Sequence, residues 1–159
     1  MRANVPGARP GWRDLIPADS RRPGQPIRGA MKRRQSEQSL HRAVAQYLDA
    51  ALPKSMFWTT FPAGGGGRIR GAQLKAMGLR AGVPDLLIMW NAATLGILQV
   101  GWIELKAKRG MVSMVQDIVH HDLRRMGCHV ACCRSLDDVQ ETLIGWGIVP
   151  KATVSRRAA

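Results

Sequence analysis

The sequence has few acidic residues, no long apolar run and few cysteines. Its 159 residues include 11 Asp and Glu against 24 Lys and Arg, which gives a formal net charge of +13. No stretch approaches the roughly 18 apolar residues of a membrane-spanning helix, and the N-terminus lacks the apolar segment of a secretory signal. Because the three cysteines include no CxxC pair, neither a disulfide framework nor a structural zinc site is expected. These absences predict a reduced intracellular protein, with a cytoplasmic location.

The large positive charge favours a polyanionic partner, either a nucleic acid or an anionic membrane surface. It is unevenly spread, since residues 1–34 carry nine Lys and Arg against two Asp. This segment is rich in Pro and Gly and has no hydrophobic period, so we expect a disordered basic arm over residues 1–34. A folded domain over residues 35–150 and a basic C-terminal tail over residues 151–159 follow. Because no basic amphipathic helix stands out, a membrane partner is not expected.

Hydrophobic periodicity predicts alternating helices and strands in the folded domain. Apolar residues at helical spacing predict a helix over 36–52, with Ser36 as its N-cap and Pro53 as its stop. The segment AGGGGRIRG (63–71) predicts a loop. The other predicted elements are strands at 56–61, 84–90, 97–107 and 128–134, and helices at 72–79, 113–127 and 135–147. This order describes an α/β domain in which helices flank a small mixed sheet.

Two of the predicted strands carry charged residues among apolar ones. The connection NAATLG (91–96) between them is short enough for an antiparallel hairpin. In that hairpin Asp85, at the start of the first strand, lies beside Glu104 and Lys106 near the end of the second. Because strand side chains alternate between faces, Glu104 and Lys106 point the same way. The three charges therefore converge at one end of the sheet.

Two carboxylates placed in this way form a site for a hard divalent cation such as Mg²⁺ or Mn²⁺. A cation held there would polarise a phosphodiester oxygen and lower the pKa of a bound water molecule, and a nearby ammonium could stabilise developing negative charge. The alternative is that Asp85, Glu104 and Lys106 simply pair with one another at the sheet edge.

The same residues resemble the signature of the PD-(D/E)xK nuclease superfamily, and the wider pattern is similar to its VRR-NUC branch. The resemblance covers about residues 36–147 and rests on LKAMGLRAGVPDLLI (74–88) and WIELKAKRGMVSMVQ (102–116). It implies a restriction-endonuclease-like core and metal-dependent DNA cleavage, with Asp85 and Glu104 as metal ligands and Lys106 as the catalytic lysine. It also implies that small stand-alone members act as homodimers on branched DNA, such as Holliday junctions.

The resemblance adds two further catalytic candidates, Glu37 on the first helix and Gln116 after the second motif. Each also has a structural interpretation. Ser113 and Gln116 have the spacing of a capping box, and Glu37 could be an acid favoured by the dipole at the start of a helix. The structural and catalytic roles of Gln116 are compatible.

Basic residues around the predicted site are candidates for contacts with the DNA backbone. The candidates are Arg68, Arg70, Lys75, Lys108 and Arg109. His120 and His121 are adjacent on a predicted helix and therefore about 100° apart, so they are expected to be surface or boundary residues rather than a metal-binding pair.

Two hypotheses of function follow. The first is an Mg²⁺- or Mn²⁺-dependent DNA endonuclease that selects branched DNA. The second is a catalytically silent nucleic-acid-binding module on the same scaffold.

The apolar residues of the final predicted helix have two interpretations, as part of a dimer interface or as ordinary core. These residues are Val139, Leu143, Ile144 and Trp146.

Overall fold

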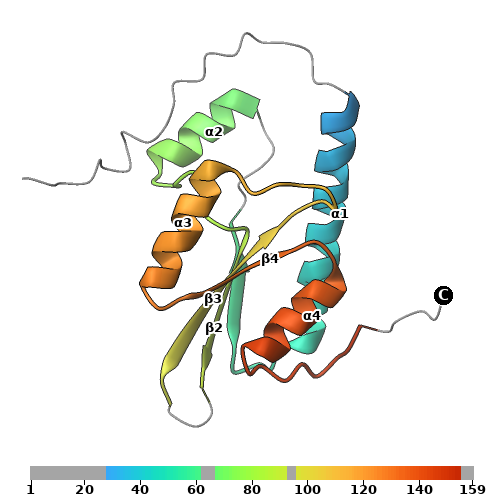
Figure 1. Ribbon diagram of the computed structural model, residues 1–159, viewed down its shortest axis with the longest axis vertical. Helices are drawn as coiled ribbons and strands as arrows, with labels where there is room; N and C mark the ends of the chain where they lie inside the picture. The colour runs from blue at the N-terminus through green and yellow to red at the C-terminus, as the bar shows by residue number, and fades with distance from the viewer. Residues whose placement is uncertain (1–27, 62–66, 93–95, 155–159) are drawn as a thin grey trace, which may run out of the picture.

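A computed structural model describes residues 28–61, 67–92 and 96–154, and its elements follow the predicted order (Figure 1). The elements are α1 (Arg28–Ala51), β1 (Phe57–Thr60), α2 (Gly67–Ala76), β2 (Leu86–Asn91), β3 (Leu98–Leu105), α3 (Met114–Arg125), β4 (His129–Cys133) and α4 (Leu136–Gly145). Within the described ranges, none of the helices combines the length and hydrophobicity that crossing a bilayer requires.

Two helices begin earlier than the sequence pattern predicted. Helix α1 begins at Arg28 rather than at Ser36, so residues 28–34 of the predicted arm are helical and Ser36 is not the N-cap. This stretch is polar and has no apolar period, but it consists mostly of good helix formers. Helix α2 begins at Gly67, inside the predicted loop, although the added residues 67–71 include two glycines, which disfavour a helix. The remainder of the predicted arm and the end of the predicted tail lie outside the described residues.

The four strands form one mixed sheet in the order β1-β2-β3-β4. The predicted hairpin of β2 and β3 is confirmed, since the two strands are antiparallel with Leu86 opposite Ile103. Strand β1 is antiparallel to β2, whereas β4 is parallel to β3 and is reached through α3. A parallel pair needs such a crossover, because a tight turn cannot join strands that run in the same direction. Because β2 and β3 are antiparallel, the segment before β2 lies beside the end of β3.

The main core lies between the sheet and the pair of helices α1 and α4, which lie side by side in Figure 1. Side chains with no exposed surface fill this layer, among them Val44, Leu48, Leu86, Ile88, Ile103, Val139 and Leu143. Helix α3 packs near β4 and buries Val119 and His120. Because Ile103 points into the core, its strand neighbours Trp102 and Glu104 point to the opposite face. The predicted charged residues of β3 thus lie on the second face of the sheet.

Gly101 in β3 gives a test of how closely α4 packs onto the sheet. A Cβ added at Gly101 would overlap the six-membered ring of Trp146, which is stacked on Trp90 with ring centroids 5.8 Å apart. Because the indole has little room to move, we expect Gly101→Ala to lower the free energy of unfolding by about 1–3 kcal/mol. Urea denaturation measures this. Gly145→Ala is the matched control, since a Cβ there meets no atom within 4 Å, and equal stabilities of the two variants would contradict the prediction.

Candidate active site

The structure brings Asp85, Glu104 and Lys106 together at one end of the sheet. Asp85 immediately precedes β2, and its Oδ2 accepts a hydrogen bond of 2.8 Å from the backbone N–H of Leu105. Glu104 lies at the end of β3, and Lys106 follows the strand with its Nζ 2.6 Å from Oε1 of Glu104. Antiparallel pairing of β2 and β3 thus places a carboxylate from each strand at the same end of the sheet.

The two oxygens of Glu104 have different surroundings. The residue is only 2% exposed, and a buried carboxylate is costly unless it is paired. Oε1 accepts from Nζ of Lys106 and from Nε2 of Gln116, each at 2.6 Å. Oε2 has no hydrogen-bond partner, and Nε2 of His120 lies 3.9 Å from it. One oxygen is therefore held by two donors, and the other remains available to a further ligand.

Gln116 caps the start of α3, as predicted, and also contacts Glu104. The capping box at the start of α3 is confirmed, since Ser113 accepts from the backbone N–H of Gln116 at 3.3 Å and donates its own backbone N–H to Oε1 of Gln116 at 3.0 Å. The amide Nε2 of the same side chain donates to Glu104. Gln116 therefore caps the first turn of α3 and also holds Glu104.

Glu37 connects α1 to the segment after β3. Its Oε1 accepts a hydrogen bond of 3.3 Å from the backbone N–H of Ala107, the residue that follows Lys106. Because α1 begins at Arg28, Glu37 is not in the first turn, and the interpretation through the helix dipole is wrong. Glu37 is placed where it fixes the backbone beside Lys106.

Asp85 is electrostatically strained. Burial raises the pKa of Asp85, and the carboxylate of Glu104 raises it further, whereas the N–H of Leu105 and the charges of His41 and Lys106 lower it. A divalent cation between the two carboxylates would relieve this strain and would also give Oε2 of Glu104 a partner. The described residues contain no group of three or more His, Cys, Asp or Glu side chains that could hold a metal. Two carboxylates fit Mg²⁺, which is commonly held by one or two of them and keeps several water molecules.

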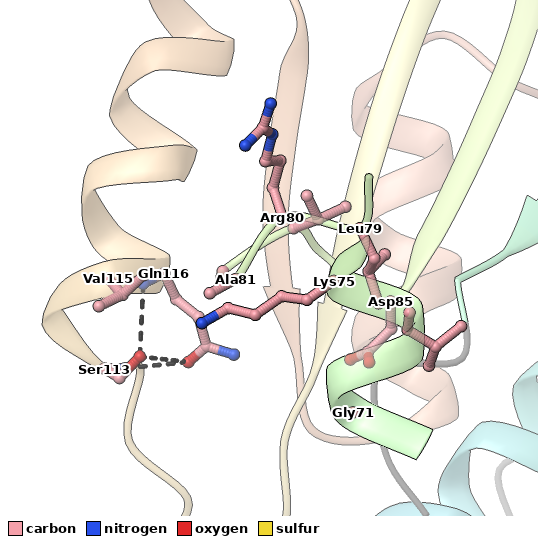
Figure 2. Close-up of a pocket in the computed structure, with 12 residues that line it drawn as sticks. Gly71, Lys75, Leu79, Arg80, Ala81, Asp85, Ser113, Val115 and Gln116 are labelled. Atoms are coloured by element: carbon pink, nitrogen blue, oxygen red, sulfur yellow. Dashed lines mark hydrogen bonds between the residues drawn. The ribbon is translucent and has the colours of Figure 1, made fainter. Parts of the chain in front are cut away.

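A pocket of about 440 Å³ opens beside this site, between α2, the segment before β2 and the start of α3 (Figure 2). Asp85 and Gln116 form part of its wall, and Lys75 and Arg80 also line it, although the guanidinium of Arg80 points away from Asp85 in Figure 2. In Figure 2 the side chain of Lys75 extends from α2 toward Gln116. The pocket can therefore receive an anionic group next to the carboxylates.

Gly82, which lines the pocket, allows the segment before β2 to pack closely against α3. Its φ is +84°, and an added Cβ would lie 2.7 Å from the backbone oxygen of Val115 on α3. Only glycine adopts this conformation at so close an approach without strain. The segment that leads to Asp85 is thus packed directly against α3.

The predicted DNA-contact residues are only partly gathered at the site. Lys75 lines the pocket, whereas Lys108 and Arg109 are exposed in the turn after β3 and do not line it. Arg68 and Arg70 belong to α2 rather than to a loop, and their side chains lie outside the described residues. Arg80, which also lines the pocket, was not among the predicted residues, although it lies within the motif LKAMGLRAGVPDLLI (74–88) that contains Asp85.

The prediction for the adjacent histidines was right for His121 and wrong for His120. His121 is exposed, but His120 is only 3% exposed and faces Glu104. The signal was present in the sequence, because His120 is four residues after Gln116 and residues at that spacing share a helix face.

Comparison with known proteins agrees with this architecture. The family model of the VRR-NUC domain matches residues 30–137. Among solved structures, a "VRR_NUC domain protein" is similar to this chain with a TM-score of 0.50 and 20% sequence identity, over 68% of this chain and 84% of that chain. At this identity the likeness shows the fold, which is the restriction-endonuclease-like core expected from the sequence. The search of curated proteins found no match.

Proposed function

The chain belongs to the VRR-NUC domain family, a nuclease family within the PD-(D/E)xK superfamily, and we propose that it is a metal-dependent endonuclease that hydrolyses phosphodiester bonds in DNA. The observation that supports this most is the convergence of Asp85 and Glu104 beside a pocket with two basic residues, with Lys106 bonded to Glu104. Because the proposed ligands are carboxylate oxygens, the cation is Mg²⁺ or Mn²⁺. We also propose an intracellular, DNA-associated location, because the chain is strongly basic and the proposed substrate is DNA.

Each residue of the site has a separate task in the proposed reaction. Asp85 and Glu104 would hold the cation, which when bound polarises a phosphoryl oxygen and lowers the pKa of a bound water molecule. Gln116 fixes Oε1 of Glu104 from α3. The ammonium of Lys106, which contacts the same oxygen, orients the attacking water or stabilises negative charge that develops on the phosphate.

The pocket residues Lys75 and Arg80 bind phosphates that flank the scissile bond. The basic residues at both ends of the chain add attraction to DNA that does not depend on its sequence. Substrate choice therefore depends on the shape of the DNA more than on its bases, since the sequence has no recognisable helix-turn-helix signature or zinc finger.

We further propose a homodimer that prefers branched DNA, such as a Holliday junction, over linear duplex. Paired cuts across a junction need two active sites related by a two-fold axis, and an isologous dimer provides them. Of the apolar residues of the final helix region, Val139 and Leu143 are core residues, whereas Ile144 is 55% exposed and Trp146 is half-buried. Only the last two remain candidates for the interface.

The deciding experiment compares the full-length protein on a four-way junction, a flap, a nicked duplex and a linear duplex of matched sequence. We expect cleavage in Mg²⁺ or Mn²⁺ and none in EDTA, with the junction cut faster than the linear duplex, because the cation supplies the reactive water. Size exclusion with light scattering gives the oligomeric state. Tight DNA binding without cleavage under every metal condition would identify a silent binding module, and a monomer that cuts all substrates equally would contradict the proposed selectivity.

A further inference from the structure

His120 is a buried polar residue to which the reaction above assigns no task. It lies on α3, and the residue is 3% exposed. Within the described ranges, the buried polar or charged residues are His120 and Glu104. Because Glu104 lies on the second face of the sheet and His120 faces it from α3, their burial is a shared property of this site and not of the main core.

The two residues face each other through atoms that have no hydrogen-bond partner. Nε2 of His120 lies 3.9 Å from Oε2 of Glu104, and both atoms are buried and unpaired. Burying unpaired polar atoms is costly. An N–H···O hydrogen bond spans roughly 2.7–3.2 Å, so a small side-chain rotation is enough to form one here.

The missing bond matters because of how Glu104 is otherwise held. Lys106 and Gln116 both bind Oε1, whereas Oε2 has no hydrogen-bond partner. A donor at Oε2 would satisfy this oxygen and hold it directly. Each carboxylate oxygen has two lone-pair directions, so Oε2 can accept from an imidazole and still bind a cation.

We propose that His120 is a positioning residue, whose Nε2–H donates to Oε2 of Glu104 and holds this oxygen in place for the divalent cation. The inference rests on the proposed function, since it assigns Glu104 to the cation. Donors of this kind, which hold a metal ligand without contacting the metal, change metal affinity by about 10–100-fold. Gln116 and His120 are one helical turn apart, so a single face of α3 serves both oxygens of Glu104.

Three variants of the full-length protein test the proposal. His120→Phe keeps a ring and removes the donor, whereas His120→Gln keeps an N–H donor at about the reach of Nε2. His121→Phe makes the same change at the exposed neighbour and is the matched control. Each protein is titrated with Mn²⁺ alone by calorimetry, and its kcat and KM are then measured on the best DNA substrate. Thermal unfolding checks the fold.

The expected result is that His120→Phe raises the Kd for Mn²⁺ about 10–100-fold and lowers kcat, with the KM for DNA unchanged. His120→Gln recovers most of both quantities, and His121→Phe matches the wild-type protein. Unchanged Mn²⁺ affinity in a folded His120→Phe variant overturns the inference. Failure of His120→Gln to recover also overturns it, because a donor would then not be what the position requires.

If His120→Phe does not fold, His120→Asn replaces it, because the shorter asparagine amide cannot reach Oε2 and should weaken Mn²⁺ binding while His120→Gln does not. Equal Mn²⁺ affinity of these two variants overturns the inference. If the wild-type protein binds Mn²⁺ but cuts no DNA, the proposed nuclease activity is wrong. The role of His120 would still be supported if His120→Phe or His120→Asn binds Mn²⁺ more weakly than the wild type and His120→Gln does not. A wild-type protein that binds no Mn²⁺ overturns both proposals.

Discussion

Replacing Glu104 with glutamine is expected to reduce DNA cleavage by roughly 10³-fold or more, because a cation bound to this carboxylate contributes several kcal/mol to the reaction. The fold should survive the change. The amide oxygen of glutamine can still accept from Lys106 and Gln116, and its nitrogen can donate to Nε2 of His120 when the imidazole carries its proton on Nδ1. Single-turnover cleavage in Mg²⁺ measures the effect, with thermal unfolding as a check on the fold.

Asp85→Asn is expected to reduce cleavage to a similar extent but to leave the cation-free protein as stable as the wild type or more so. Burial and Glu104 raise the pKa of Asp85, so the folded state favours the protonated carboxyl. The stability that protonated Asp85 gives the folded state is fully present below the ordinary pKa of an aspartate carboxyl. It is lost as the pH rises through the raised pKa of Asp85. At neutral pH the ionised Asp85 therefore destabilises the cation-free protein, and asparagine removes this effect.

Thermal unfolding at neutral pH, with and without Mg²⁺, tests this point. Mg²⁺ should raise the Tm of the wild-type protein and leave that of Asp85→Asn unchanged. Asp49→Asn, at an exposed position of α1, is the control and should behave as the wild type. Full cleavage activity in either purified carboxylate variant would defeat the assignment of the metal site.

Lys106→Met is expected to lose turnover by roughly 10²–10³-fold, the usual cost of removing one group that stabilises developing charge, while it keeps its affinity for metal and DNA. Methionine preserves the apolar stem of a side chain that is only 13% exposed, so the change removes little beyond the ammonium. Lys108→Met is the contrasting variant at an exposed, predicted DNA-contact position two residues later, where DNA affinity rather than turnover should fall.

Single-turnover cleavage is compared with a DNA-binding titration in EDTA for both lysine variants. Lys106→Met should separate the two quantities, because the ammonium lies on Glu104 and not at the exposed surface where DNA phosphates are first bound. A parallel loss of binding and turnover would instead make Lys106 a DNA-contact residue.

The meeting of Asp85 with Glu104 could be predicted because it depends on local rules. A short connection between two apolar strands favours a hairpin, and the alternation of side chains then fixes which residues share a face. The starts of α1 and α2 could not be predicted from the same signals. Neither first turn carries the apolar stripe that the predicted boundaries followed, and α2 begins with a glycine, which disfavours a helix.

The position of His120 shows where a pattern along one helix stops being informative. Helical spacing places His120 on the face of Gln116, but only the packing of α3 against the sheet determines that this face meets Glu104. The adjacent positions of His120 and His121 exclude a shared metal site, but they carry no information on a role for His120 alone. Arg80 was missed for a related reason, since the pocket it lines forms only when α2 and α3 come together.

The double use of Gln116 restricts which amino acids this position can hold during evolution. A capping box accepts glutamate as readily as glutamine, so the start of α3 alone would tolerate either. An ionised glutamate has no hydrogen to donate, and it would bring a like charge against the buried Glu104, which now accepts from the amide at 2.6 Å. The helix therefore requires a long polar side chain at position 116, and the neighbouring carboxylate requires that it be the amide. A drift from glutamine to glutamate would leave the helix intact and be selected against through the chemistry alone.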